Sequence, residues 1–376
     1  MQQLALVQKY DLLGCVQCGK CTGSCPIALK SELRIRKLVY DAIIRKDFQF
    51  DKKELWDCPT CATCELRCPK KAKPVDFICE LRGRVIEKGR IPTTLRSALE
   101  STLKHKNPWG RAKERRSDWS AELGIKRFDE GKGAEVLLYV GCTPAYDPRC
   151  QNIAKALAKI FNSLNINFGI LGNEECCCGN EMKKAGEEGL FELLAEENIS
   201  SFKKYNINKI ITISPHCYNT FKNDYPKFGV QLNIEHYTQF LSEALEKGNL
   251  SLKSAKENKI VTYHDPCYLG KRNKIFEEPR KLISNIKNLD FKEFDRHKET
   301  SLCCEGGGGR MWLESEVGKE RLGEVRVKDA LELGAEIILT SCPFCLLTLE
   351  DAVKTTNSED KIKITDIAEV VAEALS

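Results

Sequence analysis

The last two thirds of the chain alternate short apolar runs with longer segments of helical periodicity. Segments such as CQNIAKALAKIFNSLN (150–165) and EEPRKLISNIKN (277–288) repeat apolar residues three and four positions apart, which predicts amphipathic helices. Four apolar runs end in a cysteine near a turn: AEVLLYVGCTP (134–144), NKIITISPHC (208–217), NKIVTYHDPCY (258–268) and AEIILTSCPFC (335–345). Strands that alternate with helices predict parallel sheets, and such open sheets carry their sites at the C-terminal ends of the strands.

This pattern occurs twice along the chain. EECCCGN (174–180) matches SLCCEGG (301–307). Corresponding cysteines are separated by 125, 126 and 128 residues in turn: Cys142 and Cys267, Cys177 and Cys303, Cys217 and Cys345. We therefore expect two homologous α/β domains, residues 134–250 and 251–376.

The N-terminal part has a different organisation, with two cysteine runs of identical spacing. CVQCGKCTGSCP (15–26) and CPTCATCELRCP (58–69) both read C-x2-C-x2-C-x3-C-P, the run that holds two 4Fe–4S clusters in bacterial ferredoxins. Zinc sites are the alternative, but they use two ligands per short loop. Because the fourth cysteine of each run ligates the other cluster, the expected sets are Cys15, Cys18, Cys21 and Cys68, and Cys58, Cys61, Cys64 and Cys25.

The segment between the two runs has helical spacing, which distinguishes it from the strand-rich connection of a small ferredoxin. We expect a helical ferredoxin module over residues 1–92. Cys79, in VDFICELRGRVIEK (75–88), is predicted to be a buried thiol on a helix. The apolar positions that carry the helical pattern are Leu33, Ile35, Leu38, Val39, Ala42 and Ile43.

Composition narrows the class of protein. The chain has 376 residues, 20 cysteines and a net charge of +5. No apolar run approaches the roughly 18 residues of a membrane span, and the N-terminus lacks the pattern of a signal peptide. We therefore expect metal ligation in the cytoplasm rather than secreted disulfides. The small charge, without a basic motif interleaved with aromatics, argues against nucleic-acid binding.

Residues 93–133 are polar and charged, and predict a linker on the surface. Its basic centre, KHKNPWGRAKERRSDW (104–119), is either solvated or docks an acidic partner protein.

The C-terminal half reads C-x35-CC-x37-C-x2-C, with Cys267, Cys303, Cys304, Cys342 and Cys345. Together with the ferredoxin runs, this pattern resembles the catalytic iron–sulfur subunit of heterodisulfide reductases, in which a ferredoxin module is fused to two cysteine-rich CCG domains. Related subunits occur in glycolate and lactate dehydrogenase complexes and in the sulfite-reduction membrane complex. The expected fold is an α+β multidomain protein with a helical ferredoxin module and two repeated α/β CCG domains with parallel sheets.

The resemblance implies that the five cysteines of the second half hold a noncubane 4Fe–4S cluster that reduces or forms a small disulfide, such as that of coenzymes M and B. The two cubanes would deliver the electrons. The alternative is an electron-transfer subunit of a flavin-dependent dehydrogenase or a quinone-linked sulfur-metabolism complex, with the substrate chemistry on a partner. Because the chain shows no FAD or NAD motif, we expect a flavoprotein, hydrogenase-type or cytochrome b partner. Any link to the membrane would run through that partner.

The first half departs from the family pattern. Ser214 stands where the first cysteine of the final pair belongs, and Cys176 is extra. Three alternatives remain open: an ordinary cubane, a noncubane cluster with Ser214 or Cys176 as fifth ligand, or a site that has lost its cluster. The cysteines that would hold a cluster here are Cys142, Cys177, Cys178 and Cys217.

Proton donors are needed if thiols are formed. His264, close to Cys267, is the first candidate, with Asp265 beside it to orient it; the alternative is that both cap the turn. Glu305, where the family has glycine, is a second candidate, although we expect it to face water. His216 is a weaker candidate in the first half.

Lys271 and Arg272 are candidates for binding an anionic substrate group, with solvated surface as the alternative. The glycine run after Glu305 is expected where the backbone passes close to a cluster.

Overall fold

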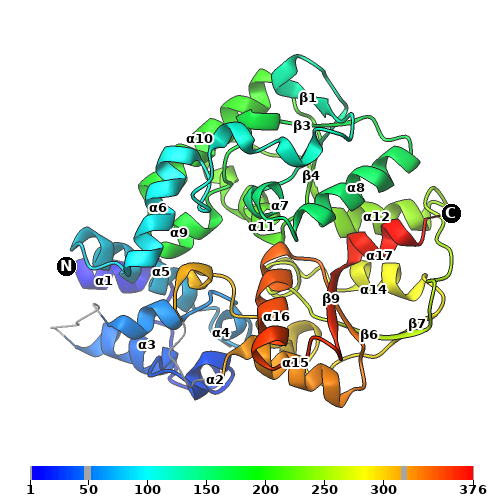
Figure 1. The fold of residues 1–376 in the computed structure, drawn as a ribbon. Helices are drawn as coiled ribbons and strands as arrows, with labels where there is room; N and C mark the ends of the chain where they lie inside the picture. Colours follow the sequence, from blue (N-terminus) through cyan, green and yellow to red (C-terminus); the bar gives the residue numbers. More distant parts are fainter. Residues whose placement is uncertain (1, 46–51, 315–319, 376) are drawn as a thin grey trace.

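The computed structural model describes residues 2–45, 52–314 and 320–375. Helices predominate in this part of the chain (Figure 1). They are α1 Gln2–Lys9, α2 Lys20–Gly23, α3 Ile35–Ile44, α4 Thr63–Leu66, α5 Pro74–Glu87, α6 Thr93–His105, α7 Cys142–Tyr146, α8 Gln151–Ser163, α9 Asn180–Ala185, α10 Glu188–Lys204, α11 Pro215–Asn223, α12 Tyr237–Glu246, α13 Gly270–Asn273, α14 Glu277–Ser284, α15 Leu322–Glu332, α16 Pro343–Thr355 and α17 Ile367–Glu373.

The strands form two parallel sheets within the described residues. Their orders are β1-β3-β2-β4-β5 and β7-β6-β8-β9, so the second sheet repeats the order of the first without its edge strand β1. Strands β2 and β4 are buried throughout, as expected where helices cover both faces of a parallel sheet. The strands are β1 Lys126–Arg127, β2 Val136–Tyr139, β3 Phe168–Ile170, β4 Ile210–Thr212, β5 Ile234–His236, β6 Lys259–Tyr263, β7 Leu289–Phe291, β8 Ile337–Thr340 and β9 Lys363–Asp366.

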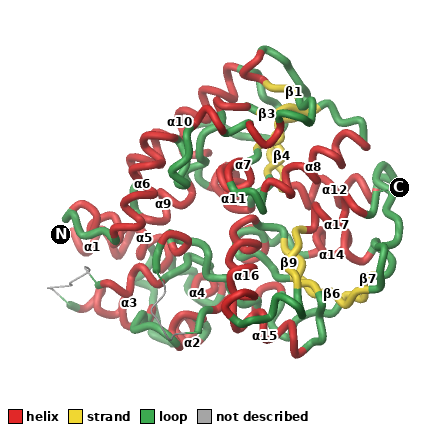
Figure 2. Tube along the Cα trace, in the orientation of Figure 1, coloured by secondary structure: helices red, strands yellow, loops and turns green. Residues whose placement is uncertain are grey.

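The two α/β halves pack through equivalent helices. Helix α8 of the first half contacts α17 of the second, and α12 contacts α14. Figures 1 and 2 show these four helices gathered on the right of the molecule, beside β4 and β9. One apolar cluster runs through both halves, including Leu138 and Phe161 of the first and Ile338 and Leu349 of the second. The predicted duplication therefore appears as two similar sheets that share a core.

The helical N-terminal module packs against both halves. Its longest helix, α5, contacts α9 of the first half, and a second apolar cluster joins Phe77 and Ile78 of the module to Phe191 and Leu194 of α10. Cys79 on α5 is buried, as predicted. In Figure 1 the module is the blue part, with the orange loop after β7 lying between it and α16.

The segment 93–133 differs from the predicted linker. Leu95, Ala98 and Leu99 form the buried face of α6, and β1 pairs with β3 at the edge of the first sheet. Apolar residues three and four positions apart bury one face of an otherwise polar helix, and the overall polarity of the segment concealed this pattern.

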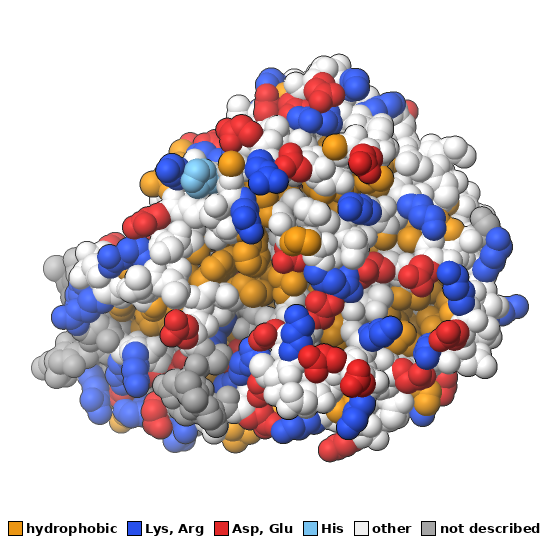
Figure 3. Space-filling view, viewed as in Figure 1, with side chains coloured by type: hydrophobic (Ala, Val, Ile, Leu, Met, Phe, Trp, Pro, Cys, Tyr) orange, Lys and Arg blue, Asp and Glu red, His pale blue; other side chains and the backbone are white. Residues whose placement is uncertain are grey.

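No helix in the described part of the chain is both long and apolar enough to cross a bilayer. The face drawn in Figure 3 mixes acidic and basic side chains over most of its area, with apolar side chains gathered near its centre.

Candidate metal centres

The five cysteines of the second half converge in one buried site. Cys303 lies within hydrogen-bonding reach of Cys267 and Cys304. The Cys304 thiol lies 3.4 Å from that of Cys345, which in turn contacts Cys342. Cys267 follows β6, and Cys342 and Cys345 follow β8 at the start of α16. The parallel sheet thus gathers them at the C-terminal ends of its strands, as predicted.

The turn after the paired cysteines directs backbone N–H groups at the thiols. The amide of Glu305 donates to Cys303 Sγ (3.3 Å) and that of Gly306 donates to Cys304 Sγ (3.4 Å). In the first half the amide of Gly179 donates to Cys177 Sγ (3.4 Å). Both turns need a left-handed residue, Gly179 at φ +83° and Glu305 at φ +78°. Thiolate ligands are stabilised by such bonds.

His264 lies beside the second-half thiols. Its ring is 1 % exposed, neither nitrogen has a hydrogen-bond partner, and one nitrogen lies within 4.8 Å of the thiols of both Cys304 and Cys345. A buried imidazole without partners costs about 1–3 kcal/mol per unsatisfied group. Five thiols and an unsatisfied imidazole in one buried site are a donor set that fits an iron–sulfur cluster.

The structure corrects the roles expected for Asp265 and Glu305. Asp265 does not orient His264; it binds Arg280 through both oxygens (2.8 and 3.0 Å). Glu305 does not face water; it is buried, pairs with Lys30 (2.7 Å) and Arg310 (2.8 Å), and accepts a hydrogen bond from the Leu322 amide. Neither carboxylate is free in the site.

Of the two cations, Lys271 is buried and Arg272 half-buried against the ferredoxin module. Lys271 Nζ donates to Thr63 Oγ1 at 2.9 Å and to the Ser301 carbonyl at 2.5 Å. Arg272 donates to the Thr60 carbonyl at 2.8 Å. The alternative of solvated surface is therefore wrong for both, and the structure gives them a role in docking the module onto the second half.

The second-half site touches the ferredoxin module directly. Cys61 lies within hydrogen-bonding reach of Cys303. Cys25, from the first cysteine run, lies near Cys61 and Cys64 of the second run. Helices α2 and α4 contact each other. Each holds the third cysteine of its run. Cys18 is exposed.

The glycine run packs on the ferredoxin loop. A Cβ on Gly308 would lie 2.7 Å from the Cys58 carbonyl oxygen, and Gly308 has φ +66°. The fully buried Arg82 donates to the carbonyls of Leu55 (2.8 Å) and Cys58 (2.7 Å) in the module, and to those of Lys184 (2.8 Å) and Gly308 (3.0 Å) in the two halves. The glycine run is expected to pass close to a cluster. In the structure it passes close to the ferredoxin module, which would carry one.

The first half gathers four thiols. Cys142 contacts Cys177, Cys177 contacts Cys178, and Cys178 contacts Cys217. The two candidates for a fifth ligand, Ser214 and Cys176, point elsewhere. The Ser214 hydroxyl accepts a hydrogen bond from the amide of His216 and caps α11. The thiol of the extra cysteine is directed at a backbone carbonyl of α10; the pair is Cys176 and Leu194.

A buried arginine from the segment 93–133 lies beside these four thiols. Arg116 Nη2 lies 3.5 Å from Cys142 Sγ and 2.7 Å from Glu175 Oε1, while Nη1 has no partner although the residue is 2 % exposed. Burial would lower the pKa of Arg116, but Cys142 and Glu175 raise it well above its ordinary value. A buried guanidinium with one unpaired nitrogen beside four thiols fits an anionic metal cluster. The polar sequence around Arg116 gave no signal of this contact.

His216 comes from the first half but lies in the second-half site. It stacks on Tyr268 with ring centres 4.1 Å apart, its Nδ1 lies 2.9 Å from Glu181 Oε1, and its ring lies within hydrogen-bonding reach of Cys342. Burial alone would lower the pKa of His216, but these two partners raise it to about 10. Burial raises the pKa of Cys342, yet hydrogen bonds with Cys345 and His216 lower it to about 6. Sequence reasoning placed His216 with the wrong cluster because it counted only neighbours along the chain.

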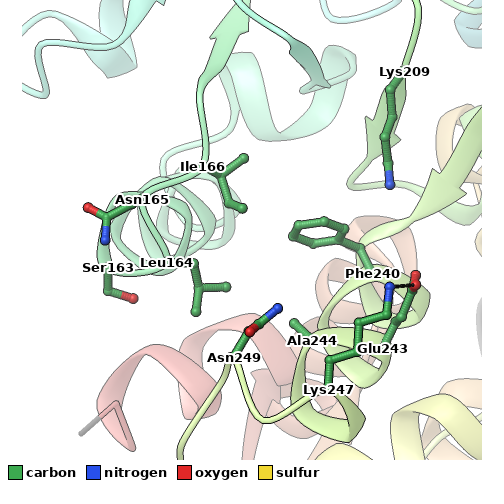
Figure 4. A pocket seen from close by; sticks show the side chains of 10 residues that line it. All are labelled: Ser163, Leu164, Asn165, Ile166, Lys209, Phe240, Glu243, Ala244, Lys247 and Asn249. Carbon is green, nitrogen blue, oxygen red and sulfur yellow. Dashed lines mark hydrogen bonds and ion pairs between the residues drawn. The ribbon is translucent and has the colours of Figure 1, made fainter.

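Two cavities differ in their relation to these sites. One of about 310 Å³ lies between the ends of α8 and α12, where Figure 4 shows Phe240, Asn249 and an ion pair between Lys247 and Glu243 but no cysteine. A smaller cavity of about 180 Å³ reaches Cys304 and is lined by Arg310, Arg321 and Met311. Of these two cavities, only the smaller one reaches a cysteine of the second-half site.

Comparison with known proteins matches both kinds of module. A cysteine-rich domain model matches residues 136–222 and 261–350, and a 4Fe–4S dicluster domain model matches residues 11–72. One subunit of the dihydromethanophenazine:CoB–CoM heterodisulfide reductase from Methanosarcina barkeri is 30 % identical over 100 % of this chain and 96 % of its own length. The chain belongs to the same family as this heterodisulfide reductase subunit.

Other relatives place this family within a wider group of redox proteins. A probable iron–sulfur-binding oxidoreductase of Bacillus subtilis is 33 % identical over 98 % of this chain and 60 % of its own length. The EtfAB:quinone oxidoreductase of Syntrophomonas wolfei is 33 % identical over 90 % of this chain and 48 % of its own length. The chain thus spans about half to three fifths of these two relatives. The predicted resemblance to heterodisulfide reductases is confirmed.

Proposed function

We propose that the chain passes electrons from its ferredoxin module to the second-half cysteine site, where a small disulfide is reduced or formed. The contact between Cys61 and Cys303 carries this proposal. It joins an expected cubane ligand to an expected ligand of the second-half cluster, so no other residue separates the two ligand sets. Among the described residues, the first-half thiols make their contacts with one another instead.

The proposed ligand sets follow the cysteine groups described above. In the second half, five thiolates would hold a noncubane 4Fe–4S cluster, which when bound supplies one-electron chemistry and iron sites open to sulfur. Two cubanes would lie in the ferredoxin module. The sets are Cys15, Cys18, Cys21 and Cys68; Cys58, Cys61, Cys64 and Cys25; and Cys267, Cys303, Cys304, Cys342 and Cys345.

For the first half we propose an ordinary four-thiolate cubane on Cys142, Cys177, Cys178 and Cys217. The orientations of Ser214 and Cys176 support this choice, because each makes a hydrogen bond that directs it to the backbone. The unsatisfied Nη1 of Arg116 supports an occupied site over one that has lost its cluster.

Among the candidate proton donors, the contacts favour His264. Asp265 and Glu305 are held in ion pairs, whereas His264 has no hydrogen-bond partner and lies beside Cys304. The cavity at Cys304 would admit the substrate, and its lining residues Arg310 and Arg321 would bind an anionic group in place of Lys271 and Arg272.

The test uses the protein loaded with iron and sulfide and oxidised in the presence of coenzyme M, the thiol that the name of the Methanosarcina relative suggests. We expect an EPR signal that broadens when the thiol carries sulfur-33, and that is absent in Cys345→Ala. A signal indifferent to the label, in a chain that holds only cubanes, would contradict disulfide chemistry at this site.

The second candidate is electron transfer without substrate chemistry, favoured by the 33 % identity to the EtfAB:quinone oxidoreductase. A partner subunit, whether a flavoprotein, a hydrogenase-type protein or a cytochrome b, would then carry the substrate. Exposed apolar side chains in the module that holds the exposed Cys18 suit a docking surface for it: Leu4, Leu13, Val16, Leu29, Tyr40 and Ile44. A signal that ignores the label, together with rapid reduction by such a partner, would support this alternative.

A further inference from the structure

His216 is covalently part of the first half, yet its side chain belongs to the second-half site. Its ring lies flat on Tyr268, with an angle of 19° between the planes, and 4.9 Å from the ring of Phe344. Phe344 lies between Cys342 and Cys345 in sequence, so the ring of His216 packs against the loop that presents both thiols. The ring also lies within hydrogen-bonding reach of the Cys342 thiol.

The other side of the ring is held by a buried carboxylate. His216 Nδ1 lies 2.9 Å from Glu181 Oε1 and 3.0 Å from Asn180 Nδ2. Asn180 Nδ2 donates to Glu181 Oε1 at 2.7 Å, and the amide of Gly309 donates to Glu181 Oε2 at 2.7 Å. Both carboxylate oxygens are therefore engaged, and the stacked ring is held in one orientation.

A metal-bound imidazole or thiolate is tuned by the groups that hydrogen-bond it. A hydrogen bond to a thiolate ligand stabilises the more negative, reduced state of an iron–sulfur cluster and so raises its reduction potential. With a carboxylate on one side of the ring and a thiolate on the other, an N–H directed at each is the favourable arrangement.

We propose that His216 donates an N–H···S hydrogen bond to the Cys342 ligand and raises the reduction potential of the second-half cluster, with Glu181 as the residue that positions it. The inference rests on the proposed cluster in the second half. Because His216 directly precedes Cys217 in the chain, the same residue joins the two cysteine sites. The potential of the second-half cluster therefore depends on a group supplied by the first half.

The test measures the midpoint potential of the second-half cluster by EPR-monitored redox titration of the loaded full chain. His216→Phe keeps an aromatic ring between Tyr268 and Phe344 but removes the N–H, and we expect a lower potential. His216→Gln retains an N–H donor and should restore part of the shift. The matched control is His236→Gln: His236 is also buried in the first half, but its ring nitrogens lie beside the Thr238 hydroxyl and the Ile213 carbonyl.

A second measurement reports on the contact itself rather than on the potential. In the wild-type chain labelled with nitrogen-15 histidine, we expect electron–nuclear double resonance to show weak coupling of histidine nitrogens to the second-half cluster. Because His264 also lies at this site, the coupling of His216 is the part that is lost in His216→Phe and kept in His264→Phe. A potential in His216→Phe equal to that of the wild type, or histidine coupling that is the same in both, would overturn the inference. If iron analysis and EPR find no second-half cluster in the wild type, the proposed function itself fails.

Discussion

The two cysteine sites occupy the same ends of sheets with the same strand order, and they differ in what surrounds the thiols. The second-half site has five thiols, lies beside His264 and touches Cys61 of the ferredoxin module. The first-half site has four thiols and lies beside the buried pair of Arg116 and Glu175. A duplicated fold has thus kept its backbone frame while its two sites acquired different neighbours.

One position shows how small the underlying change is. Ser214 and Cys342 are the N-cap residues of the equivalent helices α11 and α16. The serine hydroxyl caps its helix by accepting from the amide of His216, whereas Cys342 makes no cap bond and contacts Cys345 instead. Exchange of sulfur for oxygen therefore turns a proposed ligand position into a structural one.

The residue after the paired cysteines differs in a second way. Gly179 adopts a left-handed conformation at little cost, whereas Glu305 adopts it at about 1–2 kcal/mol. The ion pair of Glu305 with Lys30 of the ferredoxin module offsets this strain. The turn of the second half is therefore more strained than that of the first, but it carries an ion pair with the module.

The largest expected effect comes from changing the N-cap position in each half. Cys342→Ala should lose the second-half cluster, about four irons per chain, as measured by iron and sulfide analysis. Ser214→Ala, at the same position of the first half, should keep its iron and cost about 1 kcal/mol of stability through loss of the cap. A loss of about four irons from Ser214→Ala would instead make the serine a ligand and remove the difference between the halves.

The next effect tests the contact of the second half with the module. Gly308→Ala places a methyl group against the Cys58 carbonyl at a left-handed residue, so we expect a loss of about 2–4 kcal/mol in chemical denaturation. Gly229→Ala is the matched control: Gly229 has φ +75° with no atom within 4 Å of the added Cβ, and about 1–2 kcal/mol is expected. Equal losses would mean that the glycine run does not pack against the module in solution.

The effect that is smallest per pH unit concerns the last helix of each half, α12 and α17, which begin at the buried N-caps His236 and Asp366. Burial lowers the pKa of His236 to about 3 and raises that of Asp366 to about 8. Because the folded state binds the proton of His236 more weakly, its stability contribution is lost as the pH falls from 6.5 towards 3. Because the folded state binds the proton of Asp366 more strongly, its contribution is lost as the pH rises from 3.8 towards 8.

Melting temperatures measured from about pH 4 to about pH 9 would check both signs. His236→Gln should flatten the acid side of the profile, and Asp366→Asn the neutral side, each by up to about 1.4 kcal/mol per pH unit. Asp118→Asn, at an exposed carboxylate, should leave the profile unchanged. If all three profiles parallel the wild type, burial does not control these two groups.

The repeat and the cysteine spacing predicted most of the strands and helices that carry the cysteines. The strands before Cys142, Cys217, Cys267 and Cys342 appear as β2, β4, β6 and β8, and α8 and α14 lie where helical periodicity placed them. Spacing carries this information because a strand, a turn and a ligand adjacent in sequence are also adjacent in space.

Contacts between distant segments could not be predicted in this way. Lys271 binds Thr63, 208 positions away, and Asp265 turns from its neighbour His264 to Arg280. These choices follow from how the module and the halves dock, which leaves no periodic trace in the sequence. The strand β1 has only two residues, too few for any pattern to indicate it.

The guanidinium of Arg82 has a consequence for the way the chain assembles. Its acceptors come from the ferredoxin module, the first half and the second half together, so an intermediate that lacks one of these parts leaves a buried cation incompletely bonded, at a cost of several kcal/mol. The three parts therefore stabilise one another as a cooperative unit, and the chain should melt in one transition rather than module by module. The units recognised in the sequence are units of ancestry, whereas folding involves all of them at once.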